Sequence, residues 1–435
     1  MSENKLIFLE KYFFKIAIVI AFLLKLYFVF HNIWSFQMNS DEESNYNIAL
    51  QHFQTGEYPK HAFHGTGTVY IYELTMHLGI SKTQFILLFF ILSNLLYLWS
   101  IYYFHKLSSL FLDQRFTKIT TIIYAIYPST IYFIGSNFVY ENISTYILIY
   151  FSYMCIKIIN KEHFKNYTIL YLSILISISC YLRAHLIAFY LIMFISMWLI
   201  VLYKKNMQKE HFGINIVIKT SLFTMLFFTI FHYPILLKNE KLFGAKILST
   251  QSGYELLQGH NPYAKGTWNE KYFYLKNDSF RIYCNNNIKN YSSLNEYQQS
   301  EIRKNLAIKW IKENPSKELK LTINKIKIFF SPVNLKIVNA FRYYFVYNPI
   351  NIFIHIMFLI SIFTIIIKKK INSELIIIFL PIIASLSISI IFFVGMRWRF
   401  YAEPFMILIA MIGLNNIFKL TSNHFNKKNY NLKTS

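Results

Sequence analysis

Acidic side chains gather in one short stretch of a chain that otherwise contains few of them. Asp41, Glu42 and Glu43 stand in a row, in a sequence of 435 residues with only 21 acidic ones. From Tyr46 onward, apolar residues recur at helical spacing until Gly56, which predicts a short amphipathic helix with the acids on its first turn. A carboxylate held there can take the proton of a hydroxyl group, so the stretch predicts general-base chemistry.

Arginines supply the complementary chemistry. Arg183 comes directly after an apolar segment, and Arg397 and Arg399 come just before the last one. Guanidinium groups bind phosphate oxygens through paired hydrogen bonds, so these three residues predict a site for a phosphate-like anion. Other polar residues at the ends of apolar segments belong to the same candidate group: Glu141, His185, His260 and Glu403.

The elements that must position these residues are helices that cross a membrane. The chain is 55% hydrophobic and 15% charged, and its apolar runs approach the roughly 20 residues that a helix needs to cross a bilayer. We therefore expect an all-α polytopic membrane protein with about ten transmembrane helices. The expected spans are 12–33, 84–104, 119–134, 143–159, 168–182, 186–203, 221–237, 350–367, 375–394 and 404–418.

The charge pattern predicts the orientation. The formal net charge is +23, and most of the 44 basic residues fall in short loops, where the positive-inside rule places them. The positive-inside rule therefore explains the excess of basic residues, and the net charge does not indicate nucleic-acid binding. Both termini are then cytoplasmic, and the acids and arginines named above share the extracytoplasmic face. The three cysteines provide neither a disulfide framework nor a metal-ligand spacing.

Three regions follow from this layout. Residues 1–237 form an N-terminal transmembrane module with a first extracytoplasmic loop at 32–83, and residues 349–435 form C-terminal transmembrane helices and a cytoplasmic tail. Between them, 238–348 is too long for a simple loop and predicts an extracytoplasmic subdomain. Helical periodicity runs through 300–328 of this subdomain and is broken at Pro315.

Short motifs spread over the chain resemble those of one enzyme family. Asp41-Glu42 followed by Tyr46, Gly56 and Tyr58 resembles the first-loop motif of the polyprenyl-phosphate-dependent membrane glycosyltransferases, which have the GT-C fold and include protein O-mannosyltransferases and lipid A aminoarabinose transferases. Later elements of the family are resembled in the same order by Pro128 with Glu141, by Leu182-Arg183, by the run from Gly253 to Gly266 that includes Gly259-His260-Asn261-Pro262, and by Arg397-Trp-Arg-Phe-Tyr-Ala-Glu-Pro404.

The resemblance implies a reaction and roles for these residues. A hexosyl or pentosyl group passes with inversion from a polyprenyl-phosphate donor to a glycan, lipid or protein acceptor, and Asp41 takes the acceptor's proton. Glu42 and Glu141 orient the base, the acceptor or a metal, and Arg183, Arg397 and Arg399 bind the leaving phosphate. The expected sugar and acceptor pocket consists of Tyr46, Tyr58, Gly259, His260, Asn261 and Glu403. The expected location is a bacterial inner membrane, with the site facing the periplasm.

Two questions stay open at this stage. No cofactor is required, but a divalent cation could assist phosphate departure, and His52, His61 and His64 lie in the first loop. A transporter or flippase of lipid-linked sugars, or a polytopic glycan ligase or polymerase, would also need many spans and outer arginines. A transporter typically has internal repeats or broken helices at the bilayer midplane, whereas this sequence has no internal repeat and concentrates its polar residues at one face. The carboxylates after the first span favour the transferase.

Overall fold

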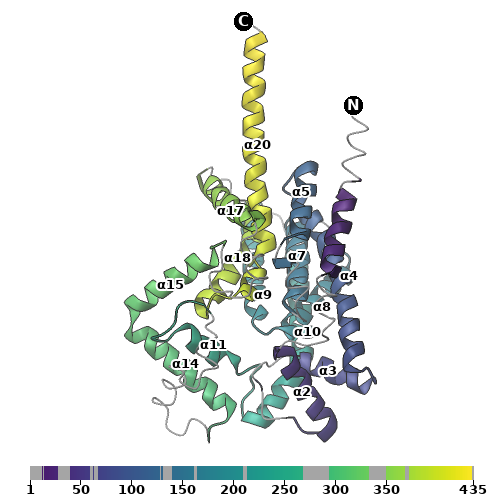
Figure 1. The fold of residues 1–435 in the computed structure, drawn as a ribbon, viewed down its shortest axis with the longest axis vertical. Coiled ribbons are helices and arrows are strands. Elements are labelled where there is room, and N and C mark those ends of the chain that lie inside the picture. Colours follow the sequence, from purple (N-terminus) through teal and green to yellow (C-terminus); the bar gives the residue numbers. More distant parts are fainter. Residues whose placement is uncertain are drawn as a thin grey trace.

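The computed structural model describes a protein built from helices (Figure 1). It describes residues 12, 14–27, 40–58, 62, 67–127, 129–130, 140–160, 164–208, 213–267, 293–332, 349–367 and 372–433. Within these ranges no strand is present, and β-type pairing is limited to an isolated bridge between Thr267 and Val394. The expectation of an all-α protein is confirmed.

The helices fall into a long-helix bundle and a group of shorter helices at one end and side of it. In chain order they are α2 (Ser40–Thr55), α3 (Thr68–His77), α4 (Lys82–Ser108), α5 (Gln114–Ala125), α7 (Tyr140–Ile159), α8 (Asn166–Leu182), α9 (Leu186–Gln208), α10 (Ile214–Phe243), α11 (Gln251–Gly259), α14 (Glu296–Glu313), α15 (Pro315–Phe329), α17 (Pro349–Ile367), α18 (Ser373–Ile391), α19 (Met396–Phe400) and α20 (Glu403–Lys433).

Six of these helices are long and apolar enough to cross a membrane: α4, α7, α9, α10, α17 and α18. They coincide with six of the ten expected spans, so the chain is a membrane protein. The other four spans stay predictions. α8 is apolar but has 17 residues, α5 has 12, and only part of the first expected span is described. α20 begins where the tenth span was expected and continues to Lys433.

Helix α7 forms the centre of the bundle. It is apolar on all sides, and 89% of its span is buried inside the protein, where it packs against α4, α8 and α18. A helix that is hydrophobic all round is expected to be enclosed by others. Two of its hydroxyl side chains bond to its own main chain, Thr145 to the Glu141 carbonyl at 2.7 Å and Ser152 to the Leu148 carbonyl at 2.9 Å. The first turn of α7 is therefore held firmly at one end of the bundle.

Helices α2 and α3 cover the end of the bundle at which α7 begins, and this end lies opposite the C-terminal end of α20 (Figure 1). The helix predicted after Ser40 is confirmed as α2, and Gly56 follows it with a φ of 73°, the left-handed conformation that glycine adopts at helix ends. α3 is tied to the bundle because the Gly67 N–H donates to the Tyr181 carbonyl at 3.0 Å. A side chain on Gly67 would overlap the Tyr181 ring. The start of α3 is thus fixed beside the end of α8.

Helices α11, α14 and α15 form the group within the predicted subdomain. The two periodic segments and the break at Pro315 are confirmed as α14 and α15, with Pro315 at the first position of α15. α11 packs on α14 through Leu257 and Ala307. Glu296 at the start of α14 accepts from the Ala62 N–H and the Thr250 hydroxyl, both at 2.8 Å, so the group is also joined to the first loop.

The group docks on the end of α18 through a close main-chain approach. Gly259 lies so near Phe392 that an added Cβ would overlap the Phe392 carbonyl oxygen. A few residues on, the Val394 N–H donates to the Gly266 carbonyl at 2.8 Å. The segment after α11 therefore runs along the segment that joins α18 to α19.

We expect Gly259→Ala to destabilise this joint, because a rigid carbonyl has to move to make room for the methyl group. Overpacking of this kind typically costs about 1–3 kcal/mol in the free energy of unfolding. The measurement is thermal unfolding of the purified protein in detergent. Gly395→Ala is the matched control, since Gly395 has an ordinary φ of −126° and its Cβ would come no closer than 3.8 Å to another side chain. Equal stability of the two variants would contradict the close approach.

Candidate active site

A buried ion pair lies at the centre of the candidate site. Glu141 is on the first turn of α7, and Arg183 directly follows α8. The Arg183 Nη2 and the Glu141 Oε1 are 3.0 Å apart, and the two side chains are only 8% and 2% exposed. Removing both charges from water costs several kcal/mol per ion, so they must satisfy each other. Two residues predicted separately for catalysis and phosphate binding thus lie in direct contact.

Tyrosines from α3 and α7 connect this pair to α2. The hydroxyls of Tyr72 and Tyr140 are 2.8 Å apart, and the Arg183 guanidinium carbon lies 5.6 Å from the centre of the Tyr140 ring. Burial raises the pKa of Tyr72, and the negative charge of the fully buried Glu42 adds to the effect, while the Tyr140 hydrogen bond and the charge of Arg183 oppose it. Glu42 and Arg183 therefore act on the same tyrosine.

The segments before α9 and after α19 close the other side of the pair. His185 Nε2 lies 3.3 Å from the Tyr401 hydroxyl. Burial lowers the pKa of His185 to about 3, with Arg183 contributing, so its imidazole is neutral at physiological pH. Burial and the charge of Glu141 raise the pKa of Tyr401, whereas Arg183 and Arg397 act in the opposite direction. Glu141, Arg183 and Arg397 therefore all act on Tyr401.

These residues define the Glu141–Arg183 cluster, which consists of Glu42, Tyr72, Tyr140, Glu141, Arg183, His185, Arg397 and Tyr401. Three buried oxygens near it have no hydrogen-bond partner among the described residues: Oε2 of Glu141, Oγ of Ser144 one turn along α7, and Oδ1 of Asn45, one turn along α2 from Glu42. Buried polar atoms without partners are rare in proteins. The cluster therefore offers acceptors for a ligand's hydroxyl groups as well as donors for an anion.

Arg399 and Glu403 lie together in a separate ion pair. Arg399 Nε is 3.1 Å from Glu403 Oε1, and its Nη1 donates to the Ser331 carbonyl at 2.7 Å. The Ser129 hydroxyl donates to the other oxygen of Glu403. Residues two apart on a helix do not share a face, which is why Arg397 and Arg399 have different surroundings. The structure thus gives Arg399 and Glu403 contacts that join α19, α20 and the segment after α15.

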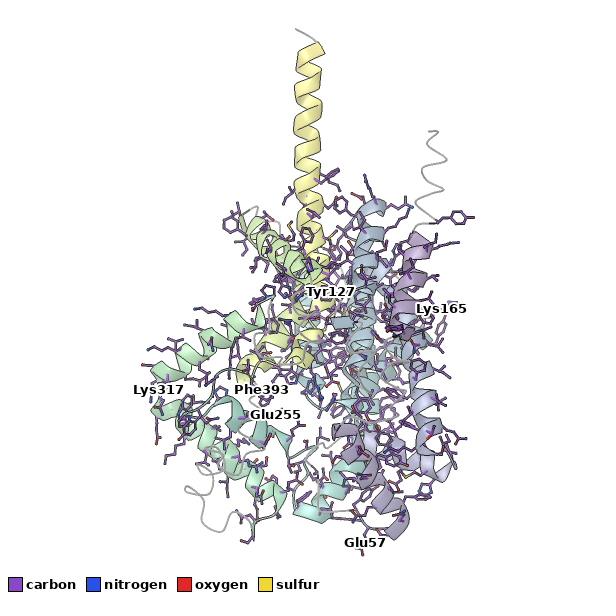
Figure 2. The ribbon with its side chains drawn as sticks, viewed as in Figure 1. Glu57, Tyr127, Lys165, Glu255, Lys317 and Phe393 are labelled. Atoms are coloured by element: carbon purple, nitrogen blue, oxygen red, sulfur yellow. The ribbon has the colours of Figure 1, made fainter. Side chains whose placement is uncertain are left out.

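Tyr127, labelled in Figure 2, is buried within the bundle. Its hydroxyl donates to Asn351 of α17, and the charges of Glu403 and Arg399 are close enough to act on it. Tyr127 therefore lies between the first turn of α17 and the Arg399–Glu403 pair.

The expected pocket residues do not lie in one place. The Tyr46 ring lies edge-on to the Tyr72 ring, with centroids 5.6 Å apart, so Tyr46 borders the Glu141–Arg183 cluster. The Tyr58 hydroxyl donates instead to Glu73 at 2.7 Å, and its ring stacks on His52. Tyr58 thus belongs to a polar contact between α2 and α3.

The Gly259-His260-Asn261 run forms the joint with α18. His260 Nε2 lies 2.7 Å from the Ile391 carbonyl. Asn261 bonds locally, with Nδ2 donating to the Leu257 carbonyl and Oδ1 accepting from the Tyr263 N–H, both at 2.8 Å. These contacts hold the end of α11 against the end of α18.

Some expected residues fall outside the described part of the chain. These are Pro128, His61, His64 and the side chain of Asp41, whose main chain lies on the first turn of α2. No group of three His, Cys, Asp or Glu residues able to hold a metal lies within the described ranges, and the divalent cation stays a prediction. Sequence reasoning missed Tyr72, Tyr140 and Tyr401. Tyr140 and Tyr401 adjoin Glu141 and the arginine motif, which was an available signal.

We expect Glu141→Gln to destabilise the protein by about 3–5 kcal/mol, because it leaves the buried Arg183 charge uncompensated. The double variant Glu141→Gln/Arg183→Met removes both charges and should recover most of the loss. The control is Lys82→Ala, which breaks an exposed pair of nearly the same length, 3.1 Å to Glu43, and should cost less than about 1 kcal/mol. Unfolding measured in detergent checks all three. A Glu141→Gln loss no larger than that of Lys82→Ala would contradict the pairing.

Comparison with known proteins leaves the family open. No protein-family model matches the chain, and no curated protein sequence matches it either.

Proposed function

We propose that this chain is an integral membrane glycosyltransferase that moves a hexosyl or pentosyl group from a polyprenyl-phosphate donor to an extracytoplasmic glycan, lipid or protein acceptor. The observation that carries the proposal is the Glu141–Arg183 cluster, in which the carboxylates of Glu42 and Glu141 are buried with Arg183 at one end of a bundle of apolar helices. A site with buried carboxylates and an arginine at the end of such a bundle suits a reaction in which a lipid-linked phosphate leaves and an acceptor hydroxyl gives its proton to a base. The motifs that resemble those of GT-C glycosyltransferases, in the same order along the chain, support the same function.

The arginines stabilise the leaving phosphate. As the anomeric carbon–oxygen bond breaks, its electron pair stays on the lipid phosphate, which gains negative charge. Arg183 and Arg397 can stabilise that charge with guanidinium donors, which are more effective in a site from which water is excluded. Because His185 is neutral, the positive charge facing the phosphate comes from these two arginines. Tyr72 and Tyr140 add hydroxyl donors to the same surroundings.

The carboxylates bind and deprotonate the acceptor hydroxyl. The acceptor hydroxyl attacks the anomeric carbon and transfers its proton to a carboxylate, for which we assign Asp41 at the start of α2. Glu42, fully buried on the same turn, and the unpartnered oxygen of Glu141 hold the acceptor in line. Attack on the side opposite the departing phosphate inverts the configuration at that carbon.

The test is transfer from a panel of labelled polyprenyl-phosphate sugars to extracted cell-envelope acceptors by the purified protein. Removing a general base typically lowers the rate by about 10²–10⁴-fold, and we expect Asp41→Asn to fall in that range. Arg397→Ala should lower transfer because the leaving phosphate loses a donor. Glu43→Gln is the matched control, since Glu43 is an adjacent but exposed carboxylate paired with Lys82, and it should keep nearly full activity.

Two results would count against the proposal. If a well-folded wild-type protein transfers no sugar from any donor but flips a lipid-linked sugar across vesicle membranes, the chain is a transporter and not a transferase. Equal losses in Asp41→Asn and Glu43→Gln would remove the special role of Asp41.

A further inference from the structure

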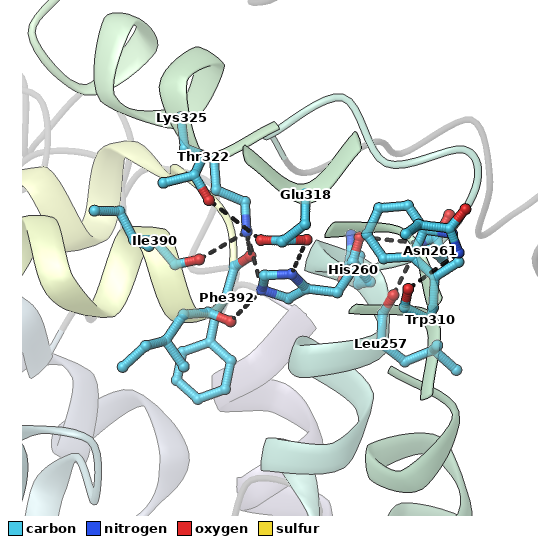
Figure 3. A network of polar contacts seen from close by, with 12 residues as sticks. Leu257, His260, Asn261, Trp310, Glu318, Thr322, Lys325, Ile390 and Phe392 are labelled. Atoms are coloured by element: carbon cyan, nitrogen blue, oxygen red, sulfur yellow. Dashed lines mark hydrogen bonds and ion pairs between the residues drawn. The ribbon is translucent and has the colours of Figure 1, made fainter. Parts of the chain in front are cut away.

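The C-terminal end of α18 is capped by side chains from two other helices (Figure 3). Lys325 of α15 donates to the carbonyls of Ile390 and Phe392, both at 2.7 Å. The carbonyl between them, that of Ile391, lies 2.7 Å from His260 Nε2. The last carbonyls of a helix have no partner within it and carry partial negative charge, so they attract donors and cations. Lys325 thus satisfies two of these carbonyls, and the Ile391 carbonyl between them accepts a hydrogen bond whenever Nε2 of His260 carries a hydrogen.

The capping side chains also contact one another. Lys325 Nζ is 3.1 Å from His260 Nε2, and His260 Nδ1 is 2.9 Å from Glu318 Oε2. Lys325 is 0% and His260 is 4% exposed. Among the described residues, α15 contributes Glu318 and Lys325 as the charged groups at this place, the end of α11 contributes His260, and α18 contacts them through its carbonyls.

The distances restrict how many protons this cluster holds. Nδ1 faces a carboxylate and must carry a hydrogen. Only one hydrogen fits on the line between two nitrogens 3.1 Å apart, so either Nε2 or Nζ provides it. With Glu318 ionised, either arrangement gives a net charge of zero, which burial favours. A second proton would place two cations in contact in a buried site.

We propose that Lys325 and His260 share one proton and, in that state, act as positioning residues for residues 390–397, which connect α18 to α19. The same segment is held by the Val394–Gly266 hydrogen bond, and it leads to Arg397. Uptake of a second proton separates the two nitrogens and releases the segment. The inference concerns docking of this segment and stands independently of the proposed transferase activity.

Burial lowers the pKa of Lys325 to about 8, although the Glu318 charge opposes the shift. Burial alone raises the pKa of Glu318, but the hydrogen bond and charge of His260, together with the charge of Lys325, outweigh it, so the pKa is lowered. A pKa that is lowered on docking means that docking is favoured at higher pH. The Lys325 shift weakens docking as pH falls from 10.5 to about 8, and the Glu318 shift weakens it near and below pH 4.5, so both act in the same direction but outside the range from pH 5 to 7.5.

The test is amide hydrogen exchange of the peptide covering 388–396 in nanodisc-embedded protein from pH 5 to 7.5, corrected for the intrinsic exchange rate. Opening should increase by up to about tenfold per pH unit as pH falls, because the released groups take up a second proton that the docked cluster excludes. In Lys325→Met the imidazolium can keep both of its hydrogen bonds, so the pH dependence should disappear. Lys327→Met, an exposed lysine of the same helix, is the matched control and should behave as the wild type does.

A flat wild-type profile, or the same slope in Lys325→Met as in the wild type, would overturn the proposal. Nitrogen-15 NMR of labelled histidines tests it without altering Lys325, with His260→Gln used to assign the signal. Between pH 5 and 8 we expect Nδ1 of His260 to remain protonated while Nε2 changes its proton occupancy. A His260 ring that carries its proton on Nε2 alone at pH 8 would be incompatible with sharing.

Discussion

The burial of Glu141 against Arg183 imposes the arrangement of everything around them. Neither charge is stable alone in this environment, so the first turn of α7 and the end of α8 have to meet at 3.0 Å. The adjoining elements are fixed accordingly. The Gly67–Tyr181 hydrogen bond ties α3 to the end of α8, which places Tyr72 against Tyr140. The segment after α19 then brings Tyr401 to His185.

Elements governed by local patterns could be predicted from the sequence. α2 with its glycine end, α14 and α15 with the break at Pro315, and six membrane-spanning helices all follow from apolar periodicity, length and terminal residues. The grouping of Glu42, Glu141, Arg183 and Arg397 could also be anticipated, because membrane topology assigns residues to a face regardless of distance along the chain. Topology does not specify contacts, however. That Glu141 lies against Arg183 depends on how α7 packs on α8.

Contacts between residues far apart in the sequence could not be predicted from local patterns. Arg399 and Glu403 are four apart, the ordinary spacing of a helical ion pair, yet their motif suggested separate roles in phosphate and sugar binding. His260 has its partners 58 and 65 residues away, which no local pattern relates to it. A partial signal did exist: Lys325 stands four residues from both Leu321 and Phe329 on the buried face of α15. A lysine in an apolar stripe requires a partner.

The Arg399–Glu403 pair at the start of α20 has a mechanical consequence. α20 is 31 residues long and extends well beyond the rest of the bundle (Figure 1). At 1.5 Å per residue it is a rod of about 45 Å, so a tilt of about 5° at its first turn would displace the far end by about 4 Å. Arg399, Glu403 and Ser129 fix only this first turn, and residues 405–412 of α20 are buried in the bundle against α17. A tilt of α20 as a rigid rod therefore requires α17 to move with it.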